Sequence, residues 1–241
     1  MNNKLPFTFF RMHPRVILLE WEQDPSPETL KELIHFKANI LKYSIGVSQI
    51  TQGYCSLLVQ WKEDIINYSD TKKDLIALYS NLNINSTSAK TKHWTLPVCY
   101  EGEFALDLEH LSSELKLSKD TIIELHSKTI YTVCFIGFLP GFLYLDGLDS
   151  KLFFPRKKNP RLVIPKGAVA IGGKQTGIYP NESPGGWHII GNTPISLFNT
   201  KNETPCFATS GDTLSFYAVD EAEYQKIRCI KNPKAYLTKV K

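Results

Sequence analysis

The sequence predicts an α+β protein of two domains, an α/β domain followed by a mostly β, barrel-like domain. Its 241 residues are enough for two small domains. The first hundred residues alternate between strand-like and helix-like hydrophobic patterns. Ten of the 14 glycines and seven of the 14 prolines lie between Gly137 and Pro194. Such a density prevents long helices and favours short strands joined by tight turns.

The N-terminal domain opens with a strand and a helix. The apolar run at 16–21 is typical of a buried strand. Ser26 and Pro27 indicate a helix start, because the hydroxyl can cap free amides and proline has no N–H to leave unpaired. The apolar face predicted for this helix consists of Leu30, Leu33, Ile34, Ala38 and Leu41.

Two strand-like runs follow over 47–61, divided near Gly53, and Asp70 is predicted to cap a second helix. The apolar positions of that helix are Leu75, Ile76, Leu78, Tyr79 and Leu82. The run 94–98 resumes as a strand. The order βαββαβ matches a ferredoxin-like unit, in which two helices cover one sheet face. We therefore assign residues 1–96 to this domain and residues 97–241 to the barrel.

The barrel domain is predicted to begin with a short helical insert over 107–126, in which Ser118 caps the second half. The β-branched and aromatic run at 130–138 predicts a strong strand, and another strand is expected to end at 219. A helix is expected over 221–230. The remaining turns and short runs favour a barrel with functional loops.

Composition excludes several classes of protein. Hydrophobic residues make up 42% and charged residues 22%, as in ordinary globular proteins, and a net charge of +4 is too small to indicate nucleic acid. No apolar run approaches the roughly 20 residues that cross a bilayer, and no secretory signal is visible, so we expect a cytoplasmic protein. Five widely spaced cysteines predict neither a zinc site nor a redox pair.

The glycine- and proline-rich segment is also basic and predicts an anionic ligand, since glycine-lined backbone can aim N–H groups at one anion. Arg161 is the favoured contact because it precedes the apolar run 162–164; solvated side chains are an equal alternative for Lys157 and Lys158. A P-loop is excluded, because Lys174 is followed by Gln175. The basic residues are Lys151, Arg156, Lys157, Lys158, Arg161, Lys166 and Lys174, against Asp146, Asp149 and Glu182.

Two residues are candidates for proton transfer. His126 could act as a general base, although a structural role near a helix C-terminus is the favoured interpretation of the sequence. Glu182 could activate water or coordinate magnesium, but no second carboxylate lies nearby in the sequence. We expect Ser183 to be a turn residue and His188 an ordinary packed or surface residue.

A set of ordered motifs resembles the carboxyltransferase-domain C/D superfamily, and within it the group of the 5-oxoprolinase B component, kinase A inhibitor and allophanate hydrolase subunit 1. The resemblance covers nearly the entire chain and weakens only before residue 96 and after residue 198. Three positions depart from the usual pattern: Asn192 replaces an arginine, Lys166 an alanine and Asn199 an aspartate. The motifs are GFLPGFLYLDGL at 137–148, IPKGAVAIGGKQTGIYP at 164–180, SPGGW at 183–187 and the segments 97–103, 107–108, 125–126, 155–156, 160–161, 190–194 and 197–198.

The resemblance implies a cyclophilin-like barrel and one component of an ATP-dependent 5-oxoprolinase, an enzyme that opens 5-oxo-L-proline to L-glutamate. It implies two partner chains, the A and C components of 5-oxoprolinase, with ATP and Mg²⁺ as cofactors, although the sequence shows no metal-ligand motif. Phosphorylation of the lactam oxygen would turn it into a leaving group. We expect Arg161, Gln175 and Glu182 to share one cavity. The expected catalytic residues are His126 and Glu182, and the expected substrate or anion contacts are Arg161, Lys174, Gln175, Thr176, Gly185, Gly186 and Trp187.

Two alternatives remain at this point. A regulatory inhibitor of a sensor histidine kinase would need an exposed apolar patch but no catalytic pocket. A component of the allophanate hydrolase type would depend on biotin or allophanate, and the sequence contains no Met-Lys-Met biotin-attachment motif.

Overall fold

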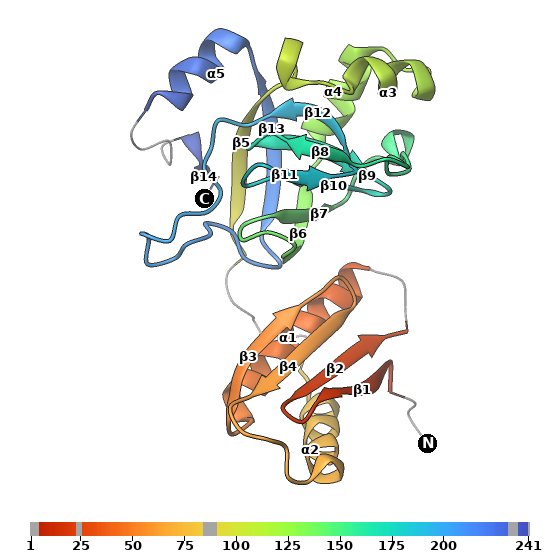
Figure 1. Cartoon of the computed structure of the whole chain (residues 1–241), viewed down its shortest axis with the longest axis vertical. Helices are drawn as coiled ribbons and strands as arrows, with labels where there is room; N and C mark the ends of the chain where they lie inside the picture. The colour runs from red at the N-terminus through yellow and green to blue at the C-terminus, as the bar shows by residue number, and fades with distance from the viewer. Residues whose placement is uncertain (1–4, 23–25, 84–90, 231–235, 241) are drawn as a thin grey trace. The chain divides into compact units, whose positions relative to one another are not determined.

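The computed structural model describes residues 5–22, 26–83, 91–230 and 236–240 and divides the chain into two compact units (Figure 1). The first unit extends to residue 90 and the second begins at residue 91. The predicted boundary at 96/97 lies inside a strand of the second unit. Each unit has its own buried hydrophobic cluster, and neither cluster draws residues from the other unit.

The N-terminal unit is an antiparallel four-stranded sheet with the strand order β1-β2-β4-β3. Apolar residues from one face of the sheet pack with Leu33, Phe36 and Ile40 of the first helix and Leu75 of the second. Both helices therefore cover the same face. The elements are β1 (Phe7–His13), β2 (Val16–Trp21), α1 (Pro27–Tyr43), β3 (Val47–Gln52), β4 (Ser56–Trp61) and α2 (Tyr68–Ser80).

The ferredoxin-like assignment of this unit is not confirmed, because its last predicted strand lies elsewhere. Residues His93–Cys99 form β5, which belongs to the sheet of the second unit. There β5 runs parallel to β13 (Thr213–Val219) over seven paired positions. In the N-terminal sheet the edge beside β2 is instead occupied by β1, a strand that the sequence patterns did not predict.

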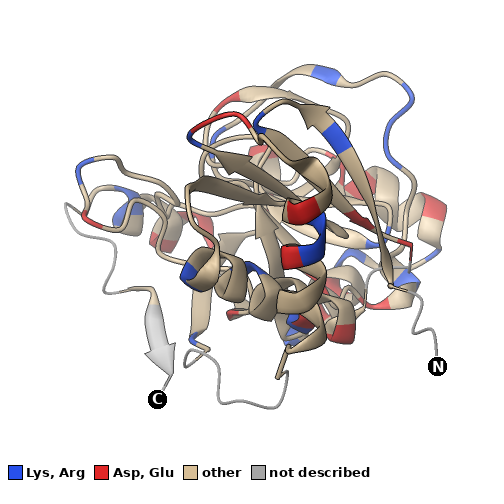
Figure 2. Ribbon diagram, turned by 90° about the horizontal axis from the view of Figure 1, so that it is seen from below, with Lys and Arg blue, Asp and Glu red and all other residues tan. Residues whose placement is uncertain are grey.

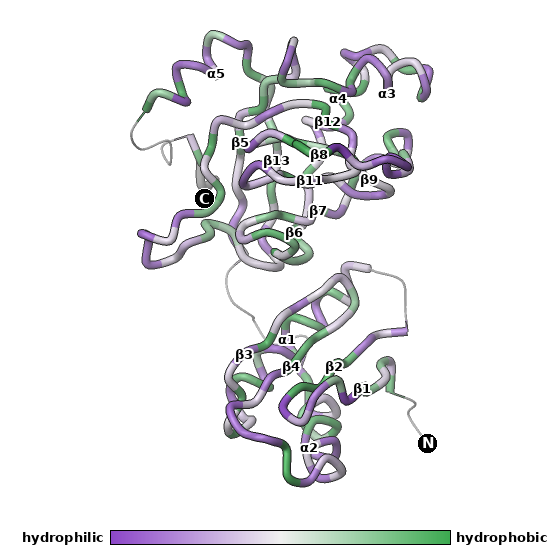
Figure 3. The backbone as a smooth tube through the Cα atoms, in the orientation of Figure 1, coloured by the Kyte–Doolittle hydropathy of each residue, from purple (hydrophilic) through white to green (hydrophobic). Residues whose placement is uncertain are grey.

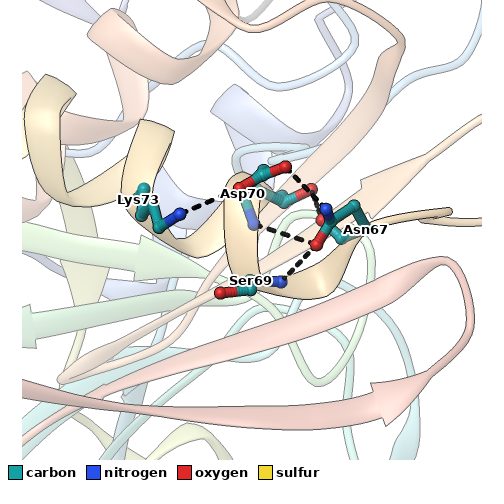
Figure 4. Close-up of polar contacts among 5 residues, drawn as sticks. Asn67, Ser69, Asp70 and Lys73 are labelled. Atoms are coloured by element: carbon teal, nitrogen blue, oxygen red, sulfur yellow. Dashed lines mark hydrogen bonds and ion pairs between the residues drawn. The ribbon is translucent and has the colours of Figure 1, made fainter.

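The helix starts show one correct prediction and one correction. Ser26 caps α1 as expected, its Oγ accepting from the amide of Thr29 at 3.1 Å. The assignment of Asp70 as cap of α2 was wrong: the cap is Asn67, whose side-chain oxygen accepts from the amides of Ser69 and Asp70 (Figure 4). Asp70 lies in the first turn, where it pairs with Lys73 at 3.1 Å.

The apolar face predicted for α1 was also partly wrong. Leu30 and Leu33 are buried, but Leu41 is 55% exposed, and the buried stripe continues through Phe36 and Ile40. A spacing of three to four residues runs through both sets of residues, so the pattern alone does not decide which set faces the sheet.

The second unit contains a closed barrel of seven strands in the order β12-β9-β10-β7-β6-β13-β5, closed by pairing of β12 with β5. Strand β14 (Thr238–Val240) adds to β5, and β8 and β11 form a separate two-stranded ribbon. This unit confirms the mostly β character predicted for the second half. The further strands are β6 (Tyr131–Ile136), β7 (Leu143–Asp146), β8 (Arg161–Ile164), β9 (Ala168–Gly172), β10 (Gln175–Ile178), β11 (Ser183–Gly185) and β12 (His188–Asn192).

The second unit also contains short helices. The predicted helical insert consists of α3 (Leu108–Leu115) and α4 (Lys119–Lys128), and Ser118 caps α4 by accepting from the amide of Thr121 at 3.1 Å. The C-terminal helix α5 (Glu221–Arg228) is largely hydrophilic (Figure 3) and buries only Tyr224 and Ile227. Two 3₁₀-helices complete the unit, η1 (Gly102–Phe104) and η2 (Ser150–Leu152).

Candidate functional site

Arg161 is placed at the start of β8 and forms a bidentate pair with Asp107. Its Nη1 and Nη2 donate to the two carboxylate oxygens at 2.5 and 2.8 Å. The same carboxylate contacts Lys157 Nζ at 2.8 Å and accepts from the amide of Ile189 at 2.8 Å. Asp107 therefore stabilises two of the basic residues of the segment, and the charge of Arg161 is already compensated within the chain.

The environment of Asp107 keeps its carboxyl group ionised. Burial alone would raise the pKa, since the residue is only 3% exposed. The hydrogen bonds from Arg161, Lys157 and the Ile189 amide outweigh burial and lower the pKa of Asp107 to about 2. The backbone of Asp107 is held as well, because its N–H donates to Ile189 O at 2.8 Å. This network fixes the start of α3 against β12.

His126 of α4 is fully buried and lies within a linear series of hydrogen bonds. Its Nδ1 lies 2.8 Å from the hydroxyl of Tyr100 and its Nε2 lies 2.9 Å from Oγ1 of Thr176. Thr176 donates to Ala170 O at 3.0 Å, so its oxygen accepts from the imidazole N–H, and Tyr100 donates to the other nitrogen. Two predicted site residues, His126 and Thr176, are thus in direct contact.

Burial also determines the protonation state of His126. The side chain has 0% exposure, and burial lowers its pKa to about 3. A neutral imidazole whose nitrogens are both occupied fits the structural interpretation of this residue. The catalytic role expected for His126 stays a prediction, and it would require this network to open.

The indole ring of Trp187 packs directly against two glycines. A Cβ on Gly172 would come within 2.6 Å of the indole ring, and one on Gly177 within 2.9 Å. Gly172 is the register partner of Gln175, which is also buried and whose Nε2 has no hydrogen-bond partner among the described residues. The guanidinium of Arg156 lies 5.3 Å from the centroid of the Trp187 ring.

The remaining expected contacts lie in different surroundings. Gly185 is the register partner of Arg161, and Gly186 O accepts from the amide of Lys157 at 2.8 Å, so these glycines lie near the Asp107 network. Lys174 and Glu182 are exposed residues of loops. Ser183 lies in β11 and not in a turn. Expected contacts thus fall into several groups, and the shared cavity expected for Arg161, Gln175 and Glu182 stays a prediction.

A pocket of about 580 Å³ lies at another part of the second unit, and we call it the barrel pocket. None of the site residues expected from the sequence lines it. It lies where η1, the turn before β9, the segment after β12 and α5 meet. The lining residues are Glu103, Phe104, Pro165, Lys166, Asn192, Thr193, Pro194, Ile195, Ser196, Tyr224 and Arg228.

The barrel pocket has a defined polar and aromatic wall. Asn192 is buried, its Oδ1 accepts from the hydroxyl of Tyr224 at 2.8 Å, and its Nδ2 donates to Lys166 O at 2.9 Å. The rings of Phe104 and Tyr224 lie 4.3 Å apart. Gly167 allows this packing, because a Cβ there would come within 2.5 Å of both Asn192 Oδ1 and Thr193 O.

Sequence reasoning missed most of this pocket. Asn192 stood out only as a departure from a family pattern, Lys166 as a departure and as one of seven basic residues, and η1 and α5 contributed no candidate. The lining comes from segments that are far apart in the sequence, and each is unremarkable alone. The two departures were nevertheless a usable signal, since the backbone carbonyl of one accepts from the side-chain amide of the other.

The charged residues and the helices that the structure describes indicate no further site. Basic and acidic residues are interleaved along the ribbon (Figure 2). Within the described residues, no group of three or more His, Cys, Asp or Glu side chains is arranged to hold a metal ion. In the same part of the chain no helix combines the length and the apolar character that a membrane span requires.

Comparisons with known proteins give consistent results. Three curated relatives carry the name of the B component of 5-oxoprolinase. The Haemophilus influenzae protein is 38% identical over 74% of this chain and 83% of its own length. The Bacillus subtilis and Escherichia coli O157:H7 proteins are 43% and 45% identical, but the matched segments span only about half of those proteins, 54% and 56%.

Solved structures show the same fold. An uncharacterised Pyrococcus horikoshii protein is 36% identical, with a TM-score of 0.54 over 90% of this chain and all of its own. The Kluyveromyces lactis urea amidolyase gives a TM-score of 0.80 over 97% of this chain and 16% of its own, at 20% identity, which supports the fold alone.

The family model for the carboxyltransferase domain, subdomain C and D, matches residues 7–208 and so spans both units. The chain belongs to the carboxyltransferase domain, subdomain C and D, family.

Proposed function

We propose that this chain is the B component of a 5-oxoprolinase and that it acts with partner chains to open 5-oxo-L-proline to L-glutamate. The observation that carries the proposal is the 38% identity to the corresponding Haemophilus influenzae 5-oxoprolinase component over 83% of that protein. The A and C components as partners, a cytoplasmic location and the cyclophilin-like description of the barrel belong to the same proposal.

The chemistry explains why such an enzyme would use several chains. A lactam carbonyl is a weak electrophile, and opening a five-membered lactam is thermodynamically resisted. ATP supplies the driving force when bound, by converting the carbonyl oxygen into a leaving group. Among the described residues no group of three or more His, Cys, Asp or Glu side chains is placed to hold a metal ion, and Arg161 is paired with Asp107, so the proposal places neither the nucleotide nor its Mg²⁺ on this chain.

Within the proposal, this chain binds a partner chain or ligand and positions the groups that contact it. Glu182 and Lys174 are exposed residues that could face a partner chain, and in the proposal Glu182 handles a proton there. Gln175 is buried and its Nε2 has no hydrogen-bond partner among the described residues, and it stays an expected contact within the proposal. Arg161, Gly185 and Gly186 lie together at the β8–β11 ribbon, which we call the Arg161 face, and the Asp107 network would hold this face in position.

Reconstitution tests the proposal. The purified chain is mixed with the products of neighbouring genes, and ATP hydrolysis is measured with and without 5-oxo-L-proline. We expect hydrolysis that depends on 5-oxoproline and forms glutamate in equal amount, and that disappears when this chain is omitted. If no combination gives 5-oxoproline-dependent hydrolysis, the proposal is rejected.

A second candidate has its own support. The Lachancea kluyveri urea amidolyase is 25% identical over 91% of this chain, although the match covers only 14% of that larger protein. A component that acts on urea-derived carboxylates is therefore the alternative. The same reconstituted mixture distinguishes the two when urea or allophanate replaces 5-oxoproline.

A further inference from the structure

The lining of the barrel pocket carries more basic than acidic side chains. Lys166 and Arg228 line it together with one acidic residue, Glu103. Neither cation takes part in an ion pair within 4.0 Å among the described residues, in contrast to Arg161. A guanidinium and an ammonium group in one concave site are suited to a carboxylate.

The pocket also presents a fixed donor for an uncharged group. The Asn192 amide has a set orientation, because Tyr224 donates to its oxygen and Lys166 O accepts from its nitrogen. An amide nitrogen has two N–H groups, and Lys166 O uses one of them. The second N–H belongs to a buried side chain of the pocket lining and can donate to a carbonyl oxygen.

The size and the aromatic wall limit the ligand further. A volume of about 580 Å³ lies in the range of roughly 300–1,000 Å³ typical of small-molecule sites. The tilted rings of Phe104 and Tyr224 provide a flat apolar surface for a small ring. Arg228 follows Tyr224 by four residues on α5, so the cation and the aromatic wall lie on the same side of the helix.

We propose that the barrel pocket binds a small cyclic carboxylate that carries an amide carbonyl. Lys166 and Arg228 contact the carboxylate, and Asn192 donates to the carbonyl. This inference rests on the proposed function and deepens it, because 5-oxoproline carries both groups on one five-membered ring. It assigns substrate binding to a different part of the unit from the Arg161 face.

Titration of the purified chain tests the ligand chemistry. Binding of 5-oxo-L-proline is measured by calorimetry beside two analogues: 2-pyrrolidinone, which lacks the carboxylate, and L-proline, which lacks the lactam carbonyl. We expect saturable binding of 5-oxoproline and at least tenfold weaker binding of either analogue. Equal binding of all three compounds would overturn the inference.

Matched variants of α5 test the site. Arg228→Gln and Lys226→Gln each remove one positive charge from the last turn of the helix, but only Arg228 lines the pocket, whereas Lys226 pairs with Glu223. We expect Arg228→Gln and Lys166→Gln each to raise Kd for 5-oxoproline about tenfold, and Lys226→Gln to change it less than twofold. Thermal unfolding checks that each variant folds, which the exposure of these residues favours.

The outcomes separate the inference from the proposed function. An active reconstituted complex with no saturable binding to the wild-type chain, or with the same Kd in Arg228→Gln and Lys166→Gln, overturns the pocket assignment and leaves the function in place. Saturable binding that both variants weaken, without coupled ATP hydrolysis in any combination, supports the pocket and rejects the function.

Discussion

Arg161 and Asp107 are 54 residues apart in the sequence and are joined by two hydrogen bonds of 2.5 and 2.8 Å. Asp107 immediately precedes α3, yet its side chain does not cap that helix. The carboxylate instead contacts β8 and β12 and holds three segments of the second unit together. Arg161 is thereby fixed in place, with its charge paired to Asp107.

Asp107→Asn should destabilise the second unit. The change leaves Arg161 and Lys157 without a counter-charge, but these side chains are 30% and 21% exposed, so we expect a loss of about 2–3 kcal/mol, at or below the low end for breaking a buried pair. Glu109→Gln is the control, because Glu109 is 80% exposed and pairs with Lys119 at the surface. Urea unfolding at pH 7 compares the two; equal losses would contradict the assigned role.

The same variant should alter acid unfolding. The folded pKa of Asp107, about 2, lies below the ordinary value of 3.8, so its ionised form stabilises the fold above pH 4. This contribution, about 2 kcal/mol, is lost as the pH falls from about 4 to 2. Wild-type stability should therefore fall more steeply than that of Asp107→Asn across this window, as measured by unfolding at successive pH values. Parallel curves would contradict the prediction.

His126 predicts a separate pH dependence at higher pH. Its folded pKa of about 3 lies below the ordinary 6.5, so the unfolded chain binds the extra proton. Stability should fall by about 1.4 kcal/mol for each pH unit below 6.5 until the pH nears 3. His126→Gln should flatten this slope between pH 6.5 and 5, but not remove it, because burial also lowers the pKa of His188.

Calorimetric unfolding across this pH range measures the effect. His13→Gln serves as the control, since His13 is an exposed residue of β1 in the other unit, and it should keep the wild-type slope. An unchanged slope in His126→Gln would show that the imidazole is not held neutral in the fold. It would also favour the catalytic role that the sequence allowed for this residue.

Local patterns predicted the elements of this fold better than their partners. The strands at 16–21 and 213–219 and the cap at Ser26 agree with the structure, because each depends on adjacent residues. Strand β5 was correctly expected as a strand but assigned to the wrong sheet, since its partner β13 lies 120 residues further along the chain. No local pattern encodes that pairing.

The candidate site shows the same limit. The contact between His126 and Thr176 joins two residues that were expected separately, and the partner of Arg161 was not expected at all. A basic segment indicates excess charge, but the sequence does not say which cations find a counter-ion. In the fold Arg161 and Lys157 find one in Asp107, whereas Lys166 and Arg228 in the barrel pocket form no described ion pair.

The cap of α2 can be tested directly. Asn67 accepts from the amides of Ser69 and Asp70, so Asn67→Ala should cost about 1 kcal/mol in the stability of the N-terminal unit. Asp70→Ala should cost less, a few tenths of a kcal/mol, because it removes exposed interactions, the pair with Lys73 and the hydrogen bond from Asn67 Nδ2, together with a favourable charge in the first turn, and leaves both amide bonds of the cap in place. The two variants are compared by urea unfolding. A larger loss for Asp70→Ala would restore Asp70 as the cap.

Alanine substitutions at Gly172 and Gly186 distinguish a packing role from a role in ligand contact. A Cβ at Gly172 would lie 2.5 Å from the indole, which is only 4% exposed and cannot withdraw, so Gly172→Ala should destabilise the second unit by about 2 kcal/mol. At Gly186 the nearest atom would lie 3.5 Å away, an ordinary contact, so Gly186→Ala should leave stability unchanged or raise it by a few tenths of a kcal/mol.

Melting temperatures and activity in the reconstituted complex give independent readouts of this pair. Gly186→Ala with normal stability but reduced activity would show that a ligand or partner approaches the backbone there, as the basic, glycine-rich sequence led us to expect. Normal stability and normal activity would limit the Gly185–Gly186 turn to shaping the Asp107 network. A destabilised Gly186→Ala beside a stable Gly172→Ala would contradict the packing of Trp187 itself, because the contact distances require the opposite order.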